Sequence, residues 1–427
     1  MEILTSYNLI IEASAIIILS FFFGELSRKT NIPSVLMLIV LGIVLKFGLD
    51  AVGGESINFF PMLELLGIVG LIMIVLEAAL ELELKREKSI PIAKAFGIAL
   101  VGLILSTWVA ALILHHFIDG MTMQAAWLYA TPLSILSSAI IIPSVAGLNE
   151  DKREFHIYES TFSDILGIMV FYFLTGQMDA AEHSSGIIGF GGNVILTVVL
   201  SLIASYLIVL VFQNIKTHTK LFLLIAVLLL LYAIGKKMHL SSLIIILVFG
   251  LLIANMPLFF QGRLKQWLHL EKAKHIYEGL HVITMETAFV VRTFFFVIFG
   301  LTISLASLAS VNVAIISGLI ILSIYVIRFV ILRLFVGKDI IPQLFIAPRG
   351  LITILLFYAI PPEAQVPGFE AGILLFIIIA TSLIMTVAMI YDKHRTSQAV
   401  RKAEGTPVGY ERWKAPTIEA VASKKEH

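Results

Sequence analysis

Residues 221–235 read LFLLIAVLLLLYAIG, a run without charged side chains and without alternation of apolar and polar residues. Similar runs recur along nearly the whole chain of 427 residues, of which 59% are hydrophobic and only 14% are charged. A soluble protein carries about 25% charged residues, and about 20 apolar residues in a helix cross the hydrocarbon core of a bilayer. A membrane β-barrel needs strict alternation, which these runs lack. The sequence therefore predicts an all-α polytopic membrane protein.

Thirteen membrane spans are expected in this chain. They lie near residues 8–23, 33–49, 61–80, 91–114, 124–147, 157–177, 187–211, 220–235, 241–256, 282–303, 312–336, 341–360 and 371–391. A transmembrane domain then covers residues 1–391, and a short polar tail covers 392–427. Lys and Arg gather in the loops after odd-numbered spans, which the positive-inside rule assigns to the cytoplasm. We therefore expect the amino end outside and the tail in the cytoplasm, in a bacterial inner (plasma) membrane.

Five charged side chains are expected at one depth inside the membrane. Asp164 is the only Asp well inside a span, and Glu77, Arg292, Arg328 and Arg349 come from four other spans. At the rise of an α-helix, all five lie about 12–17 Å from the cytoplasmic ends of their spans. Because charges inside a membrane are costly, such a shared level predicts an ion site built between helices.

Span 157–177 carries two carboxylates that are expected to have different partners. Ser160 and Asp164 are one turn apart and share a helix face, with Ser163 beside them. Glu159 lies about 140° around the helix from Asp164. Glu159 is therefore expected to meet an Arg on another span.

Structural roles remain open for some of these charges. Glu77 and Glu159 can each form an ion pair that only supports the fold. Arg292 can reach toward the membrane surface or pair with Glu286 on its own span. The sequence alone does not choose between these roles and a direct role in the ion site.

Two spans contain residues that interrupt helices. Span 124–147 holds Pro132 and Pro143, and span 341–360 holds Pro348 and Gly350. Proline lacks the amide donor and clashes with the preceding turn, so both helices are expected to be broken. The freed backbone groups must line a cavity or meet polar partners. The oxygen-bearing candidates near the first break are Thr131, Ser134, Ser137 and Ser138. Interrupted helices in both halves point to a secondary transporter with inverted repeats.

Four motifs carry a resemblance to a known family. They are IVLEAALEL at 74–82, YESTFSD at 158–164, RTFFFVIFGL at 292–301 and APRGL at 347–351. With these motifs the chain resembles the monovalent cation/proton antiporter family, in its electroneutral NhaP-like branch. The second motif is similar to that family's Glu-Ser-x-x-Asn-Asp signature, and the last is similar to its Arg-Gly motif.

The resemblance implies a fold of thirteen spans, a homodimer, and a core domain that moves against a dimerisation domain. It implies that Asp164 takes either a proton or a cation, with Ser160 and Glu77 near the cation. It also implies a buried pair of Glu159 with Arg328. Arg349 matches the Arg of the family's Arg-Gly motif.

Two departures from the family pattern bear on the choice of ion. Ser163 stands where this branch usually has Asn, and the family's Thr-Asp pair in span five is missing. Thr131, Ser137 and Ser138 remain there as neutral oxygen candidates for a monovalent-cation site with Asp164 and its neighbours. The choice among Na⁺, Li⁺ and K⁺ therefore stays open.

The expected function is exchange of one monovalent cation for one proton at a single buried Asp, by alternating access and without net charge movement. No cofactor is expected, and the net charge of +1 gives no pull toward nucleic acid. An intramembrane aspartyl protease would need two Asp residues inside the membrane, so an enzyme is not expected. An ion channel and an organic-anion transporter that uses the Arg cluster are the alternatives.

Overall fold

The computed structural model describes residues 2–30, 32–51, 60–82, 84, 86–176, 186–215, 220–237, 242–260, 269–302 and 310–405. Within these residues the chain is helical and contains no strand, which confirms the all-α class. The α-helices are α1 (Glu2–Thr30), α2 (Ser34–Ala51), α3 (Phe60–Glu81), α4 (Ser89–Phe117), α5 (Met123–Ser134), α6 (Ser138–Ser144), α7 (Glu150–Gly176), α8 (Gly186–Phe212), α9 (Lys220–Lys237), α10 (Ser242–Ala254), α11 (Met256–Phe259), α12 (Leu270–Thr302), α13 (Val311–Phe335), α14 (Leu351–Tyr358) and α15 (Gly372–Gly405). Short 3-10 turns lie at η1 (Arg86–Lys88), η2 (Val145–Gly147), η6 (Gln343–Phe345) and η7 (Pro362–Ala364).

Each of the thirteen expected spans coincides with helical structure in the described residues. Six of the described segments are long and apolar enough to cross a membrane, and one of them combines α5 with α6. They are Ser89–Phe117, Met123–Ser144, Glu150–Gly176, Ala273–Thr302, Val311–Phe335 and Gly372–Asp392. The last of these spans agrees with the expected 371–391, and helix α15 continues beyond it into the expected tail, to Gly405. Residues 406–427 of the expected tail lie outside the described residues.

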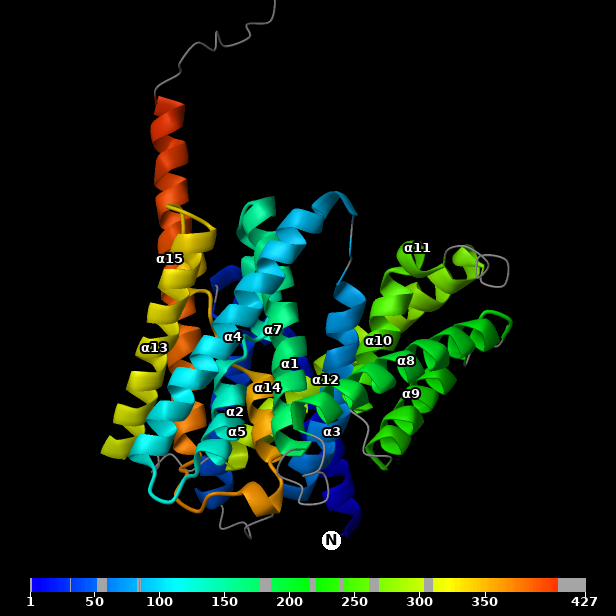
Figure 1. The fold of residues 1–427 in the computed structure, drawn as a ribbon. Helices are drawn as coiled ribbons and strands as arrows, with labels where there is room; N and C mark the ends of the chain where they lie inside the picture. Colours follow the sequence, from blue (N-terminus) through cyan, green and yellow to red (C-terminus); the bar gives the residue numbers. More distant parts are fainter. Residues whose placement is uncertain are drawn as a thin grey trace, which may run out of the picture.

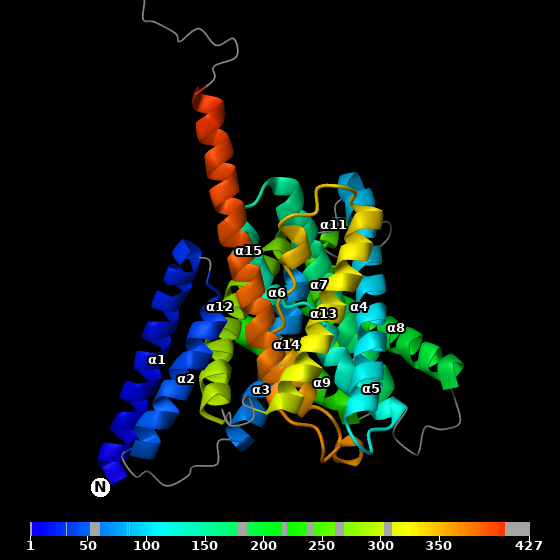
Figure 2. The ribbon, with the colours of Figure 1, turned by 90° about the vertical axis from the view of Figure 1, so that its left-hand side faces the viewer.

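The helices pack into two bundles that meet face to face (Figure 1). The core bundle consists of α4 to α7 with α13 to α15, and the flanking bundle consists of α1 to α3, α8 to α10 and α12. Figure 2 shows α1, α2 and α12 side by side, away from α4 and α5. The bundles meet where α3 contacts α7 and α14, where α10 contacts α7, and where α1 contacts α6. The first residues of α1 and the end of α15 lie at opposite ends of the molecule, as an odd number of spans requires.

Helix α13 illustrates how the sequence produces a membrane helix. Its large side chains Leu322, Val326 and Phe329 are exposed, although they are apolar. The polar residues Ser317 and Arg328 are buried on the inner side. An apolar exterior is stable only next to lipid, where the helix also satisfies its own backbone hydrogen bonds. Ser317 and Arg328 therefore face the interior of the core bundle, and the exposed apolar side chains face outward.

Candidate functional site

Two interrupted helices cross at the centre of the core bundle, as the sequence predicts. The first break is the extended stretch 135–137 between α5 and α6, and the second is the extended stretch 346–350 before α14. The Ser137 amide donates a hydrogen bond of 3.0 Å to the carbonyl oxygen of Pro348. This bond joins the two breaks directly.

The first break lies between the two prolines and not at either of them. Pro132 is inside α5, and Pro143 is inside α6. A proline weakens the turn that precedes it, because its ring and missing amide act on the residue four positions earlier. Proline therefore does not determine where this helix ends. The helix opens at 135–137, where other parts of the chain bind the freed backbone groups.

Two hydroxyl groups accept hydrogen bonds from backbone amides that have no partner within a helix at the breaks. The Leu136 amide donates to Ser163 Oγ on α7 at 3.0 Å. The Arg349 amide donates to Thr381 Oγ1 on α15 at 3.1 Å. Since a buried amide without a partner costs free energy comparable to a lost hydrogen bond, these hydroxyls stabilise the crossing.

The side chain of Arg349 binds carbonyl groups from both interrupted segments. Its Nε donates to the carbonyl oxygen of Leu133 at 2.9 Å, and its Nη1 donates to that of Ala347 at 2.8 Å. Leu133 lies in the last turn of α5, where carbonyls lack partners within the helix and carry partial negative charge. Arg349 is only 2% exposed. It therefore acts as a buried clamp on the crossing.

Two glycines allow the close approach of the segments at the crossing. A Cβ atom on Gly350 would collide with the side chain of Ser137. A Cβ atom on Gly167 of α7 would collide with the side chain of Ile135. The backbones can therefore pack this tightly only because both positions lack a side chain.

Asp164 lies on α7 beside this crossing. It is 1% exposed, and neither of its carboxylate oxygens has a hydrogen-bond partner. The hydroxyl and amide of Ser138, at the start of α6, are the polar groups beside it. Asp164 also lines a cavity whose other walls are apolar. These walls come from α3, α7, α10 and α14 and consist of Ile74, Val75, Ala78, Ile165, Ile168, Met169, Leu243, Ile244, Leu247 and Ile352.

Glu77 and Arg292 form an ion pair near this carboxylate. Arg292 Nη2 donates to Glu77 Oε2 at 2.7 Å, which links α12 to α3. Both side chains are close enough to act on Asp164 electrostatically. The alternative pairing of Arg292 with Glu286 is wrong, because Glu286 is exposed and the guanidinium turns toward α3.

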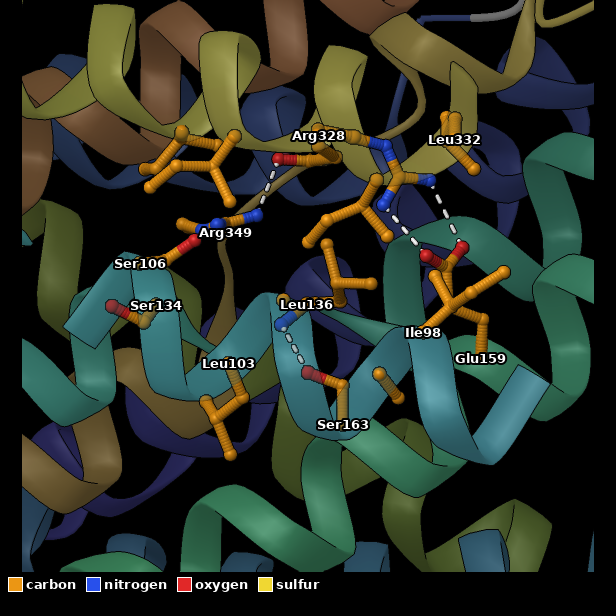
Figure 3. Close-up of a pocket in the computed structure, with 16 residues that line it drawn as sticks. Ile98, Leu103, Ser106, Ser134, Leu136, Glu159, Ser163, Arg328, Leu332 and Arg349 are labelled. Carbon is orange, nitrogen blue, oxygen red and sulfur yellow. Dashed lines mark hydrogen bonds and ion pairs between the residues drawn. The ribbon is translucent and has the colours of Figure 1, made fainter. Parts of the chain in front are cut away.

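Glu159 points away from this cavity into a second one (Figure 3). Its two oxygens accept hydrogen bonds of 2.7 and 2.9 Å from Nη1 and Nη2 of Arg328 on α13. Nδ1 of the buried His156 lies 3.2 Å from Glu159 Oε2. Arg328 Nε donates to the Gln343 carbonyl at 3.0 Å. The expected contact between Glu159 and Arg328 is therefore present, with two further partners.

Two other hydroxyl candidates bond to their own helices. Ser160 donates to the His156 carbonyl at 2.7 Å, and Thr131 donates to the Trp127 carbonyl at 2.8 Å. Each hydroxyl oxygen keeps lone pairs that can face a cation. Among the described residues, no three side chains of His, Cys, Asp or Glu gather into a metal-binding group.

Sequence reasoning missed one residue that shapes this region, Thr381, and one contact, between His156 and Glu159. Thr381 was indistinguishable from any other hydroxyl within an apolar span. His156 stands three positions before Glu159, a spacing that places two residues on neighbouring parts of a helix face. That spacing was the one available signal for the contact between them.

Comparison with known proteins places the chain among transporters. The sequence profile of the family described as "Sodium/hydrogen exchanger, transmembrane" matches residues 16–393. The search of curated protein sequences returned no match. One similar structure is the sodium proton antiporter MjNhaP1 from Methanocaldococcus jannaschii at pH 8, with 19% identity, a TM-score of 0.65, and coverage of 92% of this chain and 99% of that chain. An electron-microscopy structure of the same antiporter gives 18% identity, a TM-score of 0.63, and coverage of 96% and 100%.

At 19% and 18% identity, the two structures establish a shared fold. The match to the family profile establishes membership of the family. Cation/proton antiport is thus supported over an ion channel or an organic-anion transporter. The profile covers most of the chain, from the first membrane helix to the last. The chain therefore belongs to the sodium/hydrogen exchanger family, whose members are integral membrane transporters and not enzymes.

Proposed function

We propose that the chain exchanges one monovalent cation for one proton at Asp164, without net charge movement. The observation that carries this proposal is the burial of an unpartnered carboxylate at the crossing of two interrupted helices. A buried carboxylate without a partner needs a compensating positive charge. A proton or a bound cation supplies that charge, and the two exclude each other.

The cation is proposed to bind through oxygen atoms around Asp164. Ser138 and Ser160 supply hydroxyl oxygens, and Glu77 supplies the carboxylate oxygen that Arg292 does not bind. Hard monovalent cations prefer such ligands. Thr131, Ser137 and Ser163 border the same crossing and contribute their remaining lone pairs. Na⁺ and Li⁺ are the first candidates. K⁺ is the third candidate, and it is included because a site with few carboxylates suits a weakly hydrated ion.

The position of Asp164 between the two bundles couples the movement of the cation to the movement of the proton. The cavity beside it is lined by α3 and α10 of the flanking bundle and by α7 and α14 of the core bundle. A movement of one bundle against the other would carry Asp164 past an apolar wall. Moving it as an uncompensated charge costs several kcal/mol. Only the protonated and the cation-bound forms then change sides, which enforces exchange.

The arrangement in the membrane completes the proposal. The flanking bundle is proposed to form the interface of a homodimer. The amino end lies outside, and the tail beyond residue 391 lies in the cytoplasm of a bacterial cell. The support for this orientation is the distribution of Lys and Arg among the loops.

Replacement of Asp164 by Asn tests the proposal. The variant keeps the size of the side chain but cannot exchange a proton for a cation. In proteoliposomes with an internal pH dye, we expect proton movement driven by Na⁺, Li⁺ or K⁺ to fall to the level of protein-free vesicles. Asp339→Asn is the control, because the Asp339 side chain is 76% exposed, and it should retain exchange. Cation-driven proton movement by Asp164→Asn would remove Asp164 from the mechanism.

Electroneutrality is tested separately from the identity of the acid. A membrane potential is imposed on the same proteoliposomes with no pH gradient. One cation for one proton predicts that the exchange rate does not change with the sign of the potential. A rate that follows the potential would contradict the proposed stoichiometry and leave the role of Asp164 intact.

A further inference from the structure

The second cavity of the core bundle shares no lining residue with the apolar cavity at Asp164. Its walls come from α4, the end of α5, α7, α13 and the two breaks (Figure 3). Its polar lining consists of Ser106, Ser134, Glu159, Ser163, Arg328 and Arg349. The other lining residues are Leu136, Ala347 and side chains of α4 and α13 that are apolar or glycine. The cavity therefore places a cluster of polar side chains among apolar helix surfaces.

The charges that line this cavity do not cancel. Arg328 engages both oxygens of Glu159, so this pair is neutral. Arg349 has no carboxylate within ion-pair distance among the residues that the structure describes. The lining thus carries two guanidinium groups and one carboxylate. Because Coulomb interactions are strong in a low-dielectric interior, the unmatched positive charge favours a negative occupant.

The hydrogen-bond donors of the lining also exceed its acceptors. A guanidinium group has five N–H donors and no acceptor. Arg349 uses two of them on the carbonyls of Leu133 and Ala347, which leaves three. The Ser106 hydroxyl points toward Arg349 in Figure 3. The Ser163 oxygen accepts the Leu136 amide, so its own hydrogen is available to the cavity.

We propose that this cavity binds one small inorganic anion of the size of chloride. The anion accepts hydrogen bonds from Arg349, Ser106 and Ser163, and it compensates the charge of the guanidinium. Hydrogen bonds from ionised donors are about twice as strong as those between neutral groups. Since Arg349 clamps both interrupted helices, an anion beside it stabilises the crossing. This site differs from the cation site at Asp164 in the sign of its charge, and Ser163 is the one residue that both proposals use.

The first test measures whether chloride stabilises the purified full chain. Melting temperatures are compared in sodium chloride, sodium bromide and sodium gluconate at equal Na⁺ concentration and ionic strength. We expect a saturable rise in chloride and in bromide relative to gluconate, because gluconate is too large for the cavity. Equal melting temperatures in all three salts would overturn the proposal.

A matched pair of variants on α4 locates the effect. Ser106→Val removes one donor and fills part of the cavity with methyl groups, so we expect it to lose most of the chloride-dependent rise. Thr107→Val changes the next residue, whose buried hydroxyl has no partner and does not line the cavity. The Thr107→Val variant should keep the rise. A full chloride-dependent rise in Ser106→Val would place any anion elsewhere and overturn the proposal.

Bromide-soaked crystals give a direct readout. We expect an anomalous peak beside Arg349 in the full chain and no such peak in Ser106→Val. Density for water alone at this position would overturn the proposal. The Asp164→Asn variant should retain both the peak and the chloride-dependent rise, so the outcome is independent of the proposed cation exchange.

Discussion

Helix α7 carries two buried carboxylates five residues apart, and their surroundings are opposite. Each is 1% exposed. Glu159 accepts two hydrogen bonds from Arg328 and lies beside His156, whereas Asp164 has no partner on either oxygen. The two acids thus share a helix and a degree of burial but differ in what compensates their charge.

The difference separates a group that holds the fold from a group that is open to a ligand. Loss of the pair between Glu159 and Arg328 would leave a guanidinium group buried without its carboxylate, which is costly. The pair therefore stabilises the fold and keeps Glu159 in its position. Asp164 stands beside a cavity, and among the described residues no cationic side chain pairs with its oxygens, which have only the hydroxyl and amide of Ser138 beside them. Burial alone therefore does not distinguish the two acids, and the number of partners does.

Removal of the two acids should change stability very differently. Glu159→Ala leaves Arg328 buried without its partner, and we expect a loss of about 3–5 kcal/mol of stability. Asp164→Ala removes a carboxylate that makes no hydrogen bond, so its loss should be much smaller. Melting temperatures of the purified variants in detergent, at a single pH and salt concentration, would measure this order. Equal losses in the two variants would show that the partners of Glu159 contribute nothing to stability.

A double replacement of the ion pair should recover part of that loss. In Glu159→Leu combined with Arg328→Leu, no charge remains unpaired, and apolar pairs of similar volume often match or exceed a buried ion pair by about 1–4 kcal/mol. We expect the double variant to melt above Glu159→Leu alone. The bond from Arg328 to the Gln343 carbonyl is lost in both Arg328→Leu and the double variant, so Arg328→Leu is the matching control. A double variant that melts at or below Glu159→Leu would contradict the account of an unpaired buried charge.

Much of this contrast can be read from the sequence. The apolar runs locate the spans, and the helical period places Glu159 and Asp164 on different faces of α7. Both conclusions depend only on local geometry, which the sequence determines well. The presence of a pair between Glu159 and Arg328 follows from the resemblance to the family.

The contacts between helices were harder to predict. Arg292 pairs with Glu77 and not with Glu286, because residues six positions apart lie about 120° apart around a helix. The partner of Arg292 depends on how α12 packs against α3. The first break lies at 135–137 because Ser163 and Pro348 bind the freed amides there. These partners are 27 or more residues away, and no local pattern marks them.

The smallest predicted effect compares the two serines that lie beside the acids on α7. Ser163 accepts the Leu136 amide from the break, so Ser163→Ala leaves a buried amide without a partner and should cost about 1–3 kcal/mol. Ser160 bonds only to carbonyls of its own helix, so Ser160→Ala should change stability by about a few tenths of a kcal/mol, the range of neutral substitutions. Melting temperatures of both variants give the order. If Ser160→Ala lowered the melting temperature more than Ser163→Ala, the hydrogen-bond partners of a hydroxyl group would not predict how much that group contributes to stability.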